Sequence, residues 1–413
     1  MQNIDSLSTM PSVGAEVPLR ITSMANGGAA IGRVGQLVVF VEGAAPDELV
    51  MVRITQRRKN FARADLVDIL KPSPHRVLPG CEYFGRCGGC QWQYMGYPSQ
   101  LGAKAAILRD QIQRTLRLSD EACAGIFPAP IGMDDPWRYR NVITVEPDTE
   151  RKPSFHHLHS DRRISITHCP ISEPSISAAL TDLSATGIEA ETTIRASGEE
   201  RAVAYTSRAP KTVTLRLLGH DFRVSGGAFF QVNTRPQSGG IGGSNPTMAD
   251  TLAEHALRGL ALTGNEAVLD LYAGVGTFAI LAAPNARRVV AVEESPVAAT
   301  DARFNAQNLG AANVSVHTRS AEQFLAAFNE RIDAVVLDPP RAGCSPPVLA
   351  GLARLRPRRI VYVSCDPATL ARDLKALTEA YAIESCQLID LFPQTFHLES
   401  ITVLQRRGGA RKQ

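Results

Sequence analysis

The sequence predicts an α/β protein whose C-terminal part is a doubly wound, mostly parallel seven-stranded sheet, preceded by a small β-barrel and a β-rich middle region. From about Thr247, apolar β-branched runs alternate with helical patterns, which is typical of parallel sheets. The first helix is expected over 248–260, and the last two strands are expected at 387–392 and 401–404. Before this part, the runs 212–217 and 221–224 predict a hairpin. Between residues 16 and 70, short strand patterns are instead separated by glycine turns. Three cysteines crowd together between these two regions, which indicates a metal or cluster site in the middle of the chain.

Four short apolar runs form the N-terminal region, at 17–21, 36–41, 49–54 and 61–67. A closed small barrel is the economical way to hide so many strand edges. Its last hairpin carries several cations, one aromatic ring and no acid: Arg53, Arg57, Arg58, Lys59, Phe61 and Arg63. A phosphate-facing patch with a stacking ring and a solvated hairpin explain this run equally well.

The cysteine cluster follows the barrel at Cys81, Cys87 and Cys90, among several glycines. Thiolates hold iron–sulfur clusters, and glycines let backbone amides approach the sulfurs. Cys169 is the best candidate for a fourth ligand because a proline follows it in a tight turn. Zinc, with His75 or His168 as a mixed ligand, is the alternative. The spacing is not typical of radical enzymes, so we expect a structural cluster.

A glycine loop opens the C-terminal sheet. The predicted strand Ala267–Leu271 runs into Tyr272, Gly274, Gly276 and Thr277, where glycines allow close backbone approach to a ligand. The next strand ends in Glu293, an acid that can hydrogen-bond the ribose hydroxyls of an adenosyl cofactor. The loop lacks a Walker lysine and the third glycine of a dinucleotide fingerprint, which disfavours a triphosphatase and a dehydrogenase.

Two further strands end in chemically active residues, one in Asp338 and one in Cys365. Pro367 cannot continue a sheet ladder, so Cys365 should lie at the C-terminal end of its strand. With Asp270 and Glu293, these residues should meet in one crevice at that edge of the sheet. A lone cysteine is more often a small core residue. Because Cys365 shares the strand ends with three acidic residues, we favour a nucleophile instead.

Taken together, the motifs resemble the RNA uracil-5-methyltransferase family over nearly the whole chain. They are Phe-Phe-Gln-Val-Asn at 229–233, the glycine loop, Asp-Pro-Pro-Arg at 338–341, Ser-Cys-Asp-Pro at 364–367 and His-x-Glu-Ser at 397–400. The N-terminal region resembles a TRAM domain, an OB-like RNA-binding barrel. The resemblance implies a class I methyltransferase fold, S-adenosylmethionine as cofactor and a [4Fe-4S] cluster.

The resemblance also implies the site residues. Cys365 matches the nucleophile and Glu399 the general base, whereas Cys344 is expected in a loop or the core. Cofactor- or base-contacting positions are Gln231, Tyr272, Gly274, Gly276, Thr277, Glu293 and Asp338. Thr277 stands where the family usually has asparagine. The cluster ligands would be Cys81, Cys87, Cys90 and Cys169.

The implied activity is methyl transfer to C5 of one uridine in RNA, through a covalent bond from Cys365 to C6. The combination of a TRAM domain with a cluster is most similar to the enzyme that acts on 23S ribosomal RNA, since the transfer-RNA member of the family lacks both. The same chemistry on transfer RNA is the first alternative. A cytosine-C5 methyltransferase would carry its nucleophile directly after Pro-Pro, where Arg341 stands.

Two other classes of function fit less well. A degenerate RNA-binding module would show a damaged cofactor loop or lack the cysteine, and neither is seen. A redox or radical enzyme would use the cluster in its chemistry.

The sequence further predicts three domains, at 10–70, 71–245 and 246–413, with the glycine- and serine-rich stretch 237–245 as a hinge or loop. No apolar run is long enough to span a bilayer, and the N-terminus lacks the pattern of a secretory signal. We therefore expect a cytoplasmic protein without membrane contact, and a monomer. The net charge of +3 is too small to indicate a partner.

Overall fold

The computed structural model describes residues 11–198, 201–236 and 246–408, and these form two compact units. The first unit contains residues 11–107, His156–Arg162 and Phe392–His397; the second contains the remaining described residues. The expected hinge at 237–245 lies outside the described residues. The division into three domains stays a prediction.

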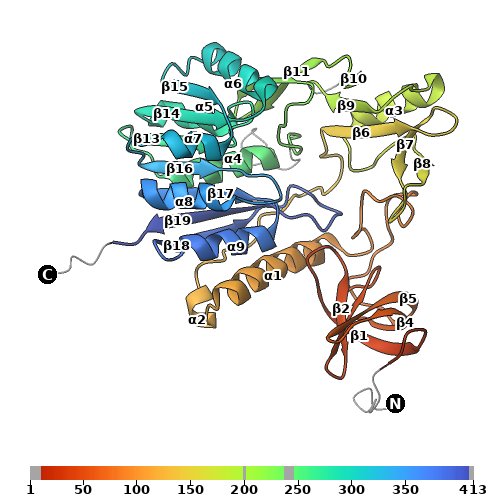
Figure 1. Ribbon diagram of the computed structural model, residues 1–413. Coiled ribbons are helices and arrows are strands. Elements are labelled where there is room, and N and C mark those ends of the chain that lie inside the picture. The colour runs from red at the N-terminus through yellow and green to blue at the C-terminus, as the bar shows by residue number, and fades with distance from the viewer. Residues whose placement is uncertain (1–10, 199–200, 237–245, 409–413) are drawn as a thin grey trace. The chain divides into compact units, whose positions relative to one another are not determined.

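The first unit begins with a closed five-stranded barrel, as the sequence predicts (Figure 1). Its strands alternate between buried and exposed residues because every second side chain faces the barrel interior. The barrel order is β1-β2-β3-β5-β4, with β3 and β5 parallel. The strands are β1 (Glu16–Met24), β2 (Ala30–Val34), β3 (Leu37–Val41), β4 (Leu49–Arg57) and β5 (Phe61–Lys71).

The cysteine-rich segment and the start of α1 (Tyr97–Leu116) complete the first unit, together with a loop from near the C-terminus. Trp92 is fully buried, and its Nε1 donates a hydrogen bond to the Gly28 carbonyl at 3.0 Å. Gln100 Nε2 donates to Gln394 Oε1 at 3.0 Å, and the Gln394 N–H donates to Gln100 Oε1 at 2.8 Å. The loop 392–397 is therefore fixed to α1 within this unit.

Two smaller sheets open the second unit. The five-stranded sheet has the order β10-β9-β6-β7-β8, and β11 pairs with β12 as the predicted hairpin. The strands are β6 (Val142–Pro147), β7 (Pro153–His156), β8 (Arg163–Ser165), β9 (Thr192–Ala196), β10 (Ala202–Tyr205), β11 (Thr212–Leu217) and β12 (His220–Ser225). The helices α2 (Asp120–Cys123) and α3 (Pro174–Thr186) belong to the same region.

A seven-stranded sheet with the order β15-β14-β13-β16-β17-β19-β18 forms the rest of the second unit. β19 runs antiparallel to both of its neighbours, β17 and β18, and the other strand pairs of this sheet are parallel. The predicted doubly wound, mostly parallel sheet is therefore confirmed. The strands are β13 (Ala267–Leu271), β14 (Arg288–Glu293), β15 (Val314–Thr318), β16 (Ala334–Leu337), β17 (Arg359–Ser364), β18 (Tyr381–Leu388) and β19 (Ser400–Arg406).

Helices cover this sheet in two layers (Figure 1). Neighbouring helices α4, α5 and α6 contact one another in one layer, and α7, α8 and α9 in the other. The helices are α4 (Met248–Leu260), α5 (Thr277–Ala282), α6 (Pro296–Asn308), α7 (Ala321–Ala327), α8 (Pro346–Leu355) and α9 (Pro367–Leu377), with the 3₁₀ turn η2 (Ala283–Asn285) after α5. Because both faces are covered, β13 and β16 are apolar and buried almost throughout.

One strand lies elsewhere than the sequence predicts. The apolar run 387–392 was expected to form a strand, but β18 ends at Leu388. The backbone of the next residues pairs with Ile131 instead, since Ile131 N–H donates to the Leu388 carbonyl and Asp390 N–H to the Ile131 carbonyl. A buried apolar run does not by itself reveal its backbone partner.

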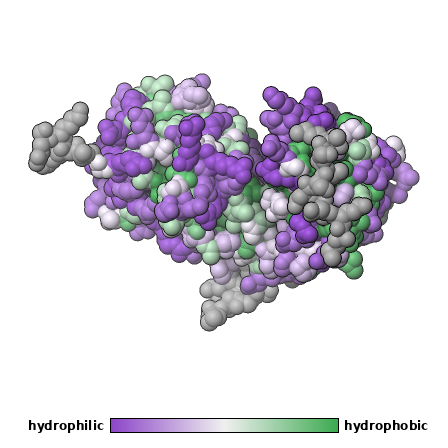
Figure 2. Space-filling view, turned by 90° about the horizontal axis from the view of Figure 1, so that it is seen from below, coloured by the Kyte–Doolittle hydropathy of each residue, from purple (hydrophilic) through white to green (hydrophobic). Residues whose placement is uncertain are grey.

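The surface shown in Figure 2 is mostly hydrophilic, with hydrophobic residues in scattered patches. Within the described ranges, no helix has both the length and the apolar character that crossing a membrane requires.

Candidate active site

The glycine loop between β13 and α5 has a left-handed backbone at three positions. Tyr272, Gly274 and Gly276 have φ angles of 63°, 55° and 88°. A Cβ at Gly276 would lie 2.9 Å from Ile280 Cδ1, so both backbone angle and space demand glycine here. Thr277 begins α5 and is partly exposed. The loop therefore presents bare backbone at the C-terminal edge of the sheet.

Glu293 fixes this loop from the neighbouring strand. The register pairs Leu271 with Val292, which places Tyr272 beside Glu293. The Gly274 N–H donates to Glu293 Oε2 at 2.8 Å, and the Ser295 N–H donates to Oε1 at 2.8 Å. A carboxylate has about four lone-pair sites, so two remain for further donors. Glu293 can thus hold the loop and still accept hydrogen bonds from ligand hydroxyls.

Asp338 lies on the other side of β13, directly after β16. Gln231 Nε2 donates to Asp338 Oδ2 at 3.3 Å, which brings the Phe-Phe-Gln-Val-Asn segment to the same edge. Burial of the carboxyl raises the pKa of Asp338 to about 7. Asp338 is therefore poised between its neutral and charged forms near neutral pH.

Asp270 lies near the other acids of this edge, since the charges of Asp338 and Glu293 act on its carboxyl. It is fully buried, and its Oδ2 accepts the Ala279 N–H at 2.8 Å. Burial, opposed by this hydrogen bond, raises the pKa of Asp270 well above its ordinary value. The Asp270 side chain thus joins the first turn of α5 to β13, a strand that is buried throughout.

Cys365 occupies the turn between β17 and α9. Asp366 caps the helix, because its Oδ1 accepts the N–H groups of Ala368 and Thr369 at 2.9 Å each. Pro367 then takes the first helical position, where its missing N–H costs nothing. Cys365 is only partly exposed and lies just before the positive end of α9.

The sheet places Glu399 next to Cys365. The antiparallel pair β17–β19 matches Ser364 with Ser400, and the Ser400 hydroxyl donates to the Ser364 carbonyl at 3.3 Å. Cys365 and Glu399 adjoin this pair where the ladder ends, and the Glu399 charge acts on the Cys365 thiol. Glu399 is 4% exposed, and its Oε1 has no hydrogen-bond partner within the described part of the chain. A buried carboxyl oxygen without a partner is costly and typical of functional sites.

These neighbours disfavour negative charge on one another. Burial, then the charges of Glu399 and Asp338, raise the pKa of Cys365 to about 12, while Arg341 acts in the opposite direction. Burial and then Asp338 raise the pKa of Glu399 well above its ordinary value. In the free protein at neutral pH, Cys365 therefore carries its proton, and ionisation of Glu399 is disfavoured.

Cys344, expected in a loop or the core, is 2% exposed. Its N–H and the Tyr362 hydroxyl donate to the same Asp373 carboxylate oxygen, each at 2.7 Å. The Tyr272 hydroxyl is hydrogen-bonded to the Cys344 side chain. Burial raises the pKa of Cys344 to about 12. It is a packed, inert thiol that helps to hold Tyr272.

The expected cluster ligands belong to different units: Cys81, Cys87 and Cys90 to the first, and Cys169 to the second. The Gly89 N–H donates to Cys87 Sγ at 3.4 Å, and backbone N–H groups of Tyr83 and Phe84 donate to Cys81. Such amides surround thiolate clusters. Across the described ranges, however, no three His, Cys, Asp or Glu side chains converge closely enough to hold a metal ion.

The basic run of the barrel is less uniform than its sequence indicates. Arg53 pairs with Glu16 of β1, at 2.8 Å between Nη2 and Oε1. Its cationic neighbours at the β4–β5 turn, Arg57, Arg58, Lys59 and Arg63, are exposed. Phe61 packs edge-on against Phe40, with ring centroids 6.0 Å apart. The turn therefore presents exposed cations beside a partly exposed ring.

Comparison with known proteins agrees with this geometry. Residues 235–407 match the family model of tRNA (uracil-5-)-methyltransferases, and residues 12–67 match that of the TRAM domain. An uncharacterised RNA methyltransferase of Thermotoga maritima is 32% identical, over 94% of this chain and 98% of its own. One of Caldanaerobacter subterraneus subsp. tengcongensis is 30% identical, over 95% and 99%.

A solved structure shares the fold over nearly the whole chain. The tRNA (uracil-54, C5)-methyltransferase of Pyrococcus abyssi, in complex with S-adenosyl-L-homocysteine, superposes with a TM-score of 0.70 at 22% identity. The match covers 94% of this chain and 100% of that one.

The fold and the acids at the edge of its sheet define an RNA methyltransferase of class I that depends on S-adenosylmethionine. The chain belongs to the RNA uracil-5-methyltransferase family, with a TRAM domain at its N-terminus.

The structure adds two features that the motifs did not reveal. Arg341 favours the thiolate of Cys365, although the sequence offered it only as evidence against a cytosine methyltransferase. The Gln231–Asp338 hydrogen bond joins segments 107 residues apart. The spacing of apolar residues along the sequence does not predict such a contact. The site otherwise contains Cys365, Glu399, Asp338 and Glu293 at one edge of the sheet, where the sequence predicts them.

Proposed function

We propose that this chain transfers a methyl group from S-adenosylmethionine to C5 of a uridine in RNA, with Cys365 as nucleophile and Glu399 as general base. The observation that carries this proposal is the β17–β19 register, which pairs Ser364 with Ser400 and so brings the adjoining residues Cys365 and Glu399 to the same edge of the sheet, where the Glu399 charge acts on the thiol. Uracil C5 does not attack a methyl group unaided, so a nucleophile and a base are both needed.

Each residue has a defined role in this reaction. The Cys365 thiolate adds to C6 of the uracil, and the electron pair of the C5–C6 double bond becomes available at C5. C5 forms a bond to the methyl group, which leaves its sulfur. Glu399 then takes the proton from C5, the double bond re-forms, and the Cys365–C6 bond breaks to release the thiolate.

The protonation states require a change on substrate binding. Ionisation of Cys365 and of Glu399 is disfavoured in the free protein, because burial and neighbouring carboxylates raise their pKa values. Bound S-adenosylmethionine supplies the methyl group and a positive charge, which favours the ionised forms of nearby acids. Arg341 acts in the same direction on Cys365. We therefore infer that both acids become active only in the assembled complex.

The residues that would hold the cofactor are those of the glycine loop and its neighbours. Glu293 retains lone pairs for ribose hydroxyls, and Gly274 and Gly276 expose backbone to a close ligand. Tyr272 and Thr277 flank this loop. Gln231 and Asp338 share a hydrogen bond that either the cofactor or the uracil edge could replace.

The target uridine must be unpaired or flipped out of its stack to reach Cys365. We propose a uridine of 23S ribosomal RNA, because the chain combines a TRAM domain with four cysteines in the expected pattern. A transfer-RNA uridine is the second candidate. It is supported by the transfer-RNA enzyme of Pyrococcus abyssi, whose fold covers 94% of this chain, so the architecture alone does not separate the two substrates.

Mass mapping of 5-methyluridine in a strain that lacks this gene tests the activity and the substrate together. Loss of one 5-methyluridine from 23S ribosomal RNA, restored by the intact gene but not by Cys365→Ala, is the expected result. Loss from transfer RNA alone would select the second candidate. Unchanged 5-methyluridine in both RNAs would contradict the proposed activity.

We further propose that Cys81, Cys87, Cys90 and Cys169 hold a [4Fe-4S] cluster with a structural role. The amides directed at Cys81 and Cys87 support thiolate ligands. Protein purified without oxygen should show the broad visible absorbance of such a cluster and about four iron atoms per chain. Stoichiometric zinc without visible absorbance would contradict it. We also propose a cytoplasmic location, which an RNA substrate supports, and a monomer, because one chain carries every residue invoked.

A further inference from the structure

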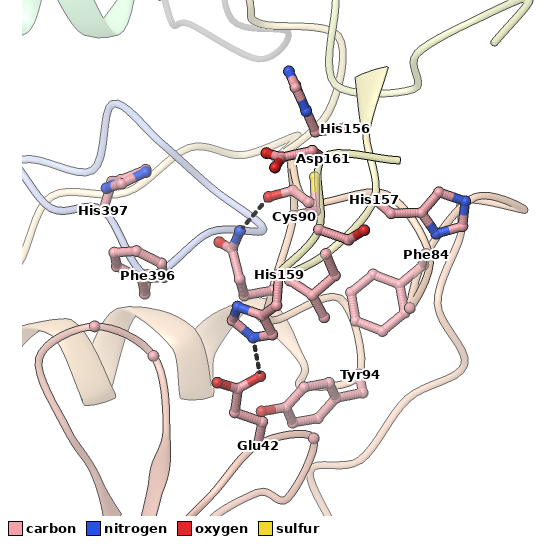
Figure 3. Close-up of a pocket in the computed structure, with 18 residues that line it drawn as sticks. Glu42, Phe84, Cys90, Tyr94, His156, His157, His159, Asp161, Phe396 and His397 are labelled. Carbon is pink, nitrogen blue, oxygen red and sulfur yellow. Dashed lines mark hydrogen bonds and ion pairs between the residues drawn. The ribbon is translucent and has the colours of Figure 1, made fainter. Parts of the chain in front are cut away.

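The first unit contains a cavity of about 660 Å³ that the proposed reaction does not use. Its walls come from five separate stretches: the two barrel turns at Gly28 and Glu42, the cysteine-rich segment, residues 156–161, and the pair Phe396–His397 (Figure 3). The volume lies within the range of about 300–1,000 Å³ typical of ligand sites. We call this space the barrel cavity.

Aromatic rings line two sides of the barrel cavity. Phe396 and His397 lie on one side, with ring centroids 4.4 Å apart, and Phe84 and Tyr94 lie on the other, 6.2 Å apart (Figure 3). Phe84, Phe396 and His397 are only partly buried, so their rings remain accessible. Every nucleobase has a face that stacks on such rings.

The polar groups suit the edge of a neutral base better than a phosphate. His159 Nε2 is hydrogen-bonded to Glu42 Oε2 at 2.7 Å, and Gln91 Nε2 donates to the Gly88 carbonyl at 2.7 Å (Figure 3). Two lining carboxylates, Glu42 and Asp161, would repel a phosphate. The cavity thus offers donors and acceptors beside stacking rings.

The backbone at Gly28 fixes the position of the Phe396 ring before any ligand binds. Its φ is 96°, and a Cβ would lie 2.8 Å from Phe396 Cδ1. The Phe396 ring therefore rests directly on bare backbone, which the Trp92 hydrogen bond to the Gly28 carbonyl holds in place. A rigid ring binds a stacked base with little loss of side-chain entropy.

We propose that the barrel cavity binds a second unpaired nucleobase of the substrate RNA, distinct from the methylated uridine. This inference deepens the proposed function and rests only on RNA being the substrate. His397 lies two residues before Glu399 in the chain, so an occupied cavity also restrains the segment that leads to the general base. RNA with a second unpaired base would be selected over RNA that offers the uridine alone.

Binding of fluorescein-labelled 12-nucleotide oligoadenylate and oligouridylate, measured by anisotropy at several salt concentrations, tests the proposal. Protein purified without oxygen should be used, so that any cluster is retained. Phe396→Ala should raise Kd about 5- to 150-fold, the effect of losing one stacked base. The slope of log Kd against log salt should not change, because stacking releases no counterions.

Two variants provide matched controls. Phe304→Ala removes a ring that is 44% exposed in the second unit and should leave Kd unchanged. Lys59→Ala, at the basic β4–β5 turn, should lower the salt slope, because it removes a cation that contacts phosphate. Affinity and salt slope thus separate stacking from charge.

Ser160→Trp fills the barrel cavity without removing a ring and decides the matter if Phe396→Ala fails to fold. It too should raise Kd with an unchanged slope. If folded Phe396→Ala and Ser160→Trp both bind as tightly as the wild type, the cavity proposal is wrong, while methylation through Cys365 stands. If the wild type binds neither RNA at low salt, the proposed function itself fails.

Discussion

Cys365 lies among groups that oppose its ionisation. Burial is the largest cause of its raised pKa, and Glu399 and Asp338 add repulsion, whereas Arg341 lowers the pKa. A thiol in such surroundings reacts slowly until a ligand changes the charge around it. This would protect the free enzyme from alkylation and oxidation.

Alkylation of Cys365 by iodoacetamide should therefore depend steeply on pH. With a pKa of about 12, the thiolate fraction should rise about tenfold per pH unit between pH 7 and 10, and the rate with it. Peptide mass mapping of the segment that contains Cys365 measures this rate. A plateau below pH 9 would show that the thiol already ionises in the free protein.

The neighbours of Cys365 should shift this profile in opposite directions. Arg341→Ala removes a charge that lowers the pKa, so alkylation should slow at a given pH. Glu399→Gln removes the carboxyl group whose ionised form raises the pKa of the thiol, so alkylation should accelerate at pH values where Glu399 would ionise. Equal rates in both variants would mean that burial alone controls the thiol.

The sequence predicts Cys365 and Glu399 as the reacting residues through motifs, but it does not predict their protonation. Their pKa values depend on burial and on neighbouring charges, which the register of β17 with β19 helps to bring together. The placement of Asp270 in the same crevice stays a prediction. Its Oδ2 accepts the Ala279 N–H of α5, and the charges of Asp338 and Glu293 also act on its carboxyl.

At the scale of elements, the turn from β13 to α5 brings bare backbone to the sheet edge. Gly276 is the residue that this turn depends on, because it combines a positive φ with contact to Ile280 and Ala302. Methyltransferase activity and stability should both be sensitive to this position.

Gly276→Ala should lower the free energy of unfolding by about 1–3 kcal/mol, because it forces a strained backbone and a 2.9 Å contact. Denaturant titration measures the change. Gly102→Ala is the matched control: Gly102 is exposed within α1, and a Cβ there meets nothing within 4 Å. It should stabilise the protein by about 0.4–1 kcal/mol. Equal effects at both positions would contradict this account of the turn.

Elements with strong local signals were predicted well. The helix expected over 248–260 is α4, which has a capping box formed by Thr247 and Asp250. The hairpin β11–β12 follows from its alternating residues and tight turn. The bounds predicted for the strand at 387–392 were wrong, because the backbone after Leu388 pairs with Ile131, which is distant in sequence.

At the scale of the whole molecule, the loop 392–397 is one of the places where the chain passes between the two units. This loop belongs to the first unit, where Gln100 and Gln394 exchange hydrogen bonds, and Glu399 follows it in the second. Glu399, the proposed general base, is thus tethered to a loop that the other unit holds.

Gln100→Leu should lower the free energy of unfolding by about 1–3 kcal/mol, because it leaves the buried Gln394 N–H without its partner. It should also lower kcat for methylation more than it weakens RNA binding, since the loop leads directly to Glu399. Gln113→Leu, on the same helix but with an exposed amide, should change stability by no more than about 0.5 kcal/mol. Unaltered kcat in folded Gln100→Leu would show that the tether has no role in catalysis.

The identity of the substrate RNA is the property of the whole molecule that the sequence predicts least well. Barrel, cysteine segment and methyltransferase sheet were all predicted, but the same architecture extends over 94% of the chain in the comparison with a transfer-RNA enzyme. We expect recognition of one RNA to depend on exposed side chains such as those of the barrel cavity and the β4–β5 turn.

The most direct test of the central claim is to trap the covalent intermediate between Cys365 and RNA. Glu399→Gln cannot remove the C5 proton, so with S-adenosylmethionine and substrate RNA it should give a slow-migrating band on a denaturing gel. Mass mapping should place RNA on Cys365 in that band. Cys365→Ala should bind RNA but form no adduct and transfer no methyl group. Methyl transfer by Cys365→Ala would contradict the account.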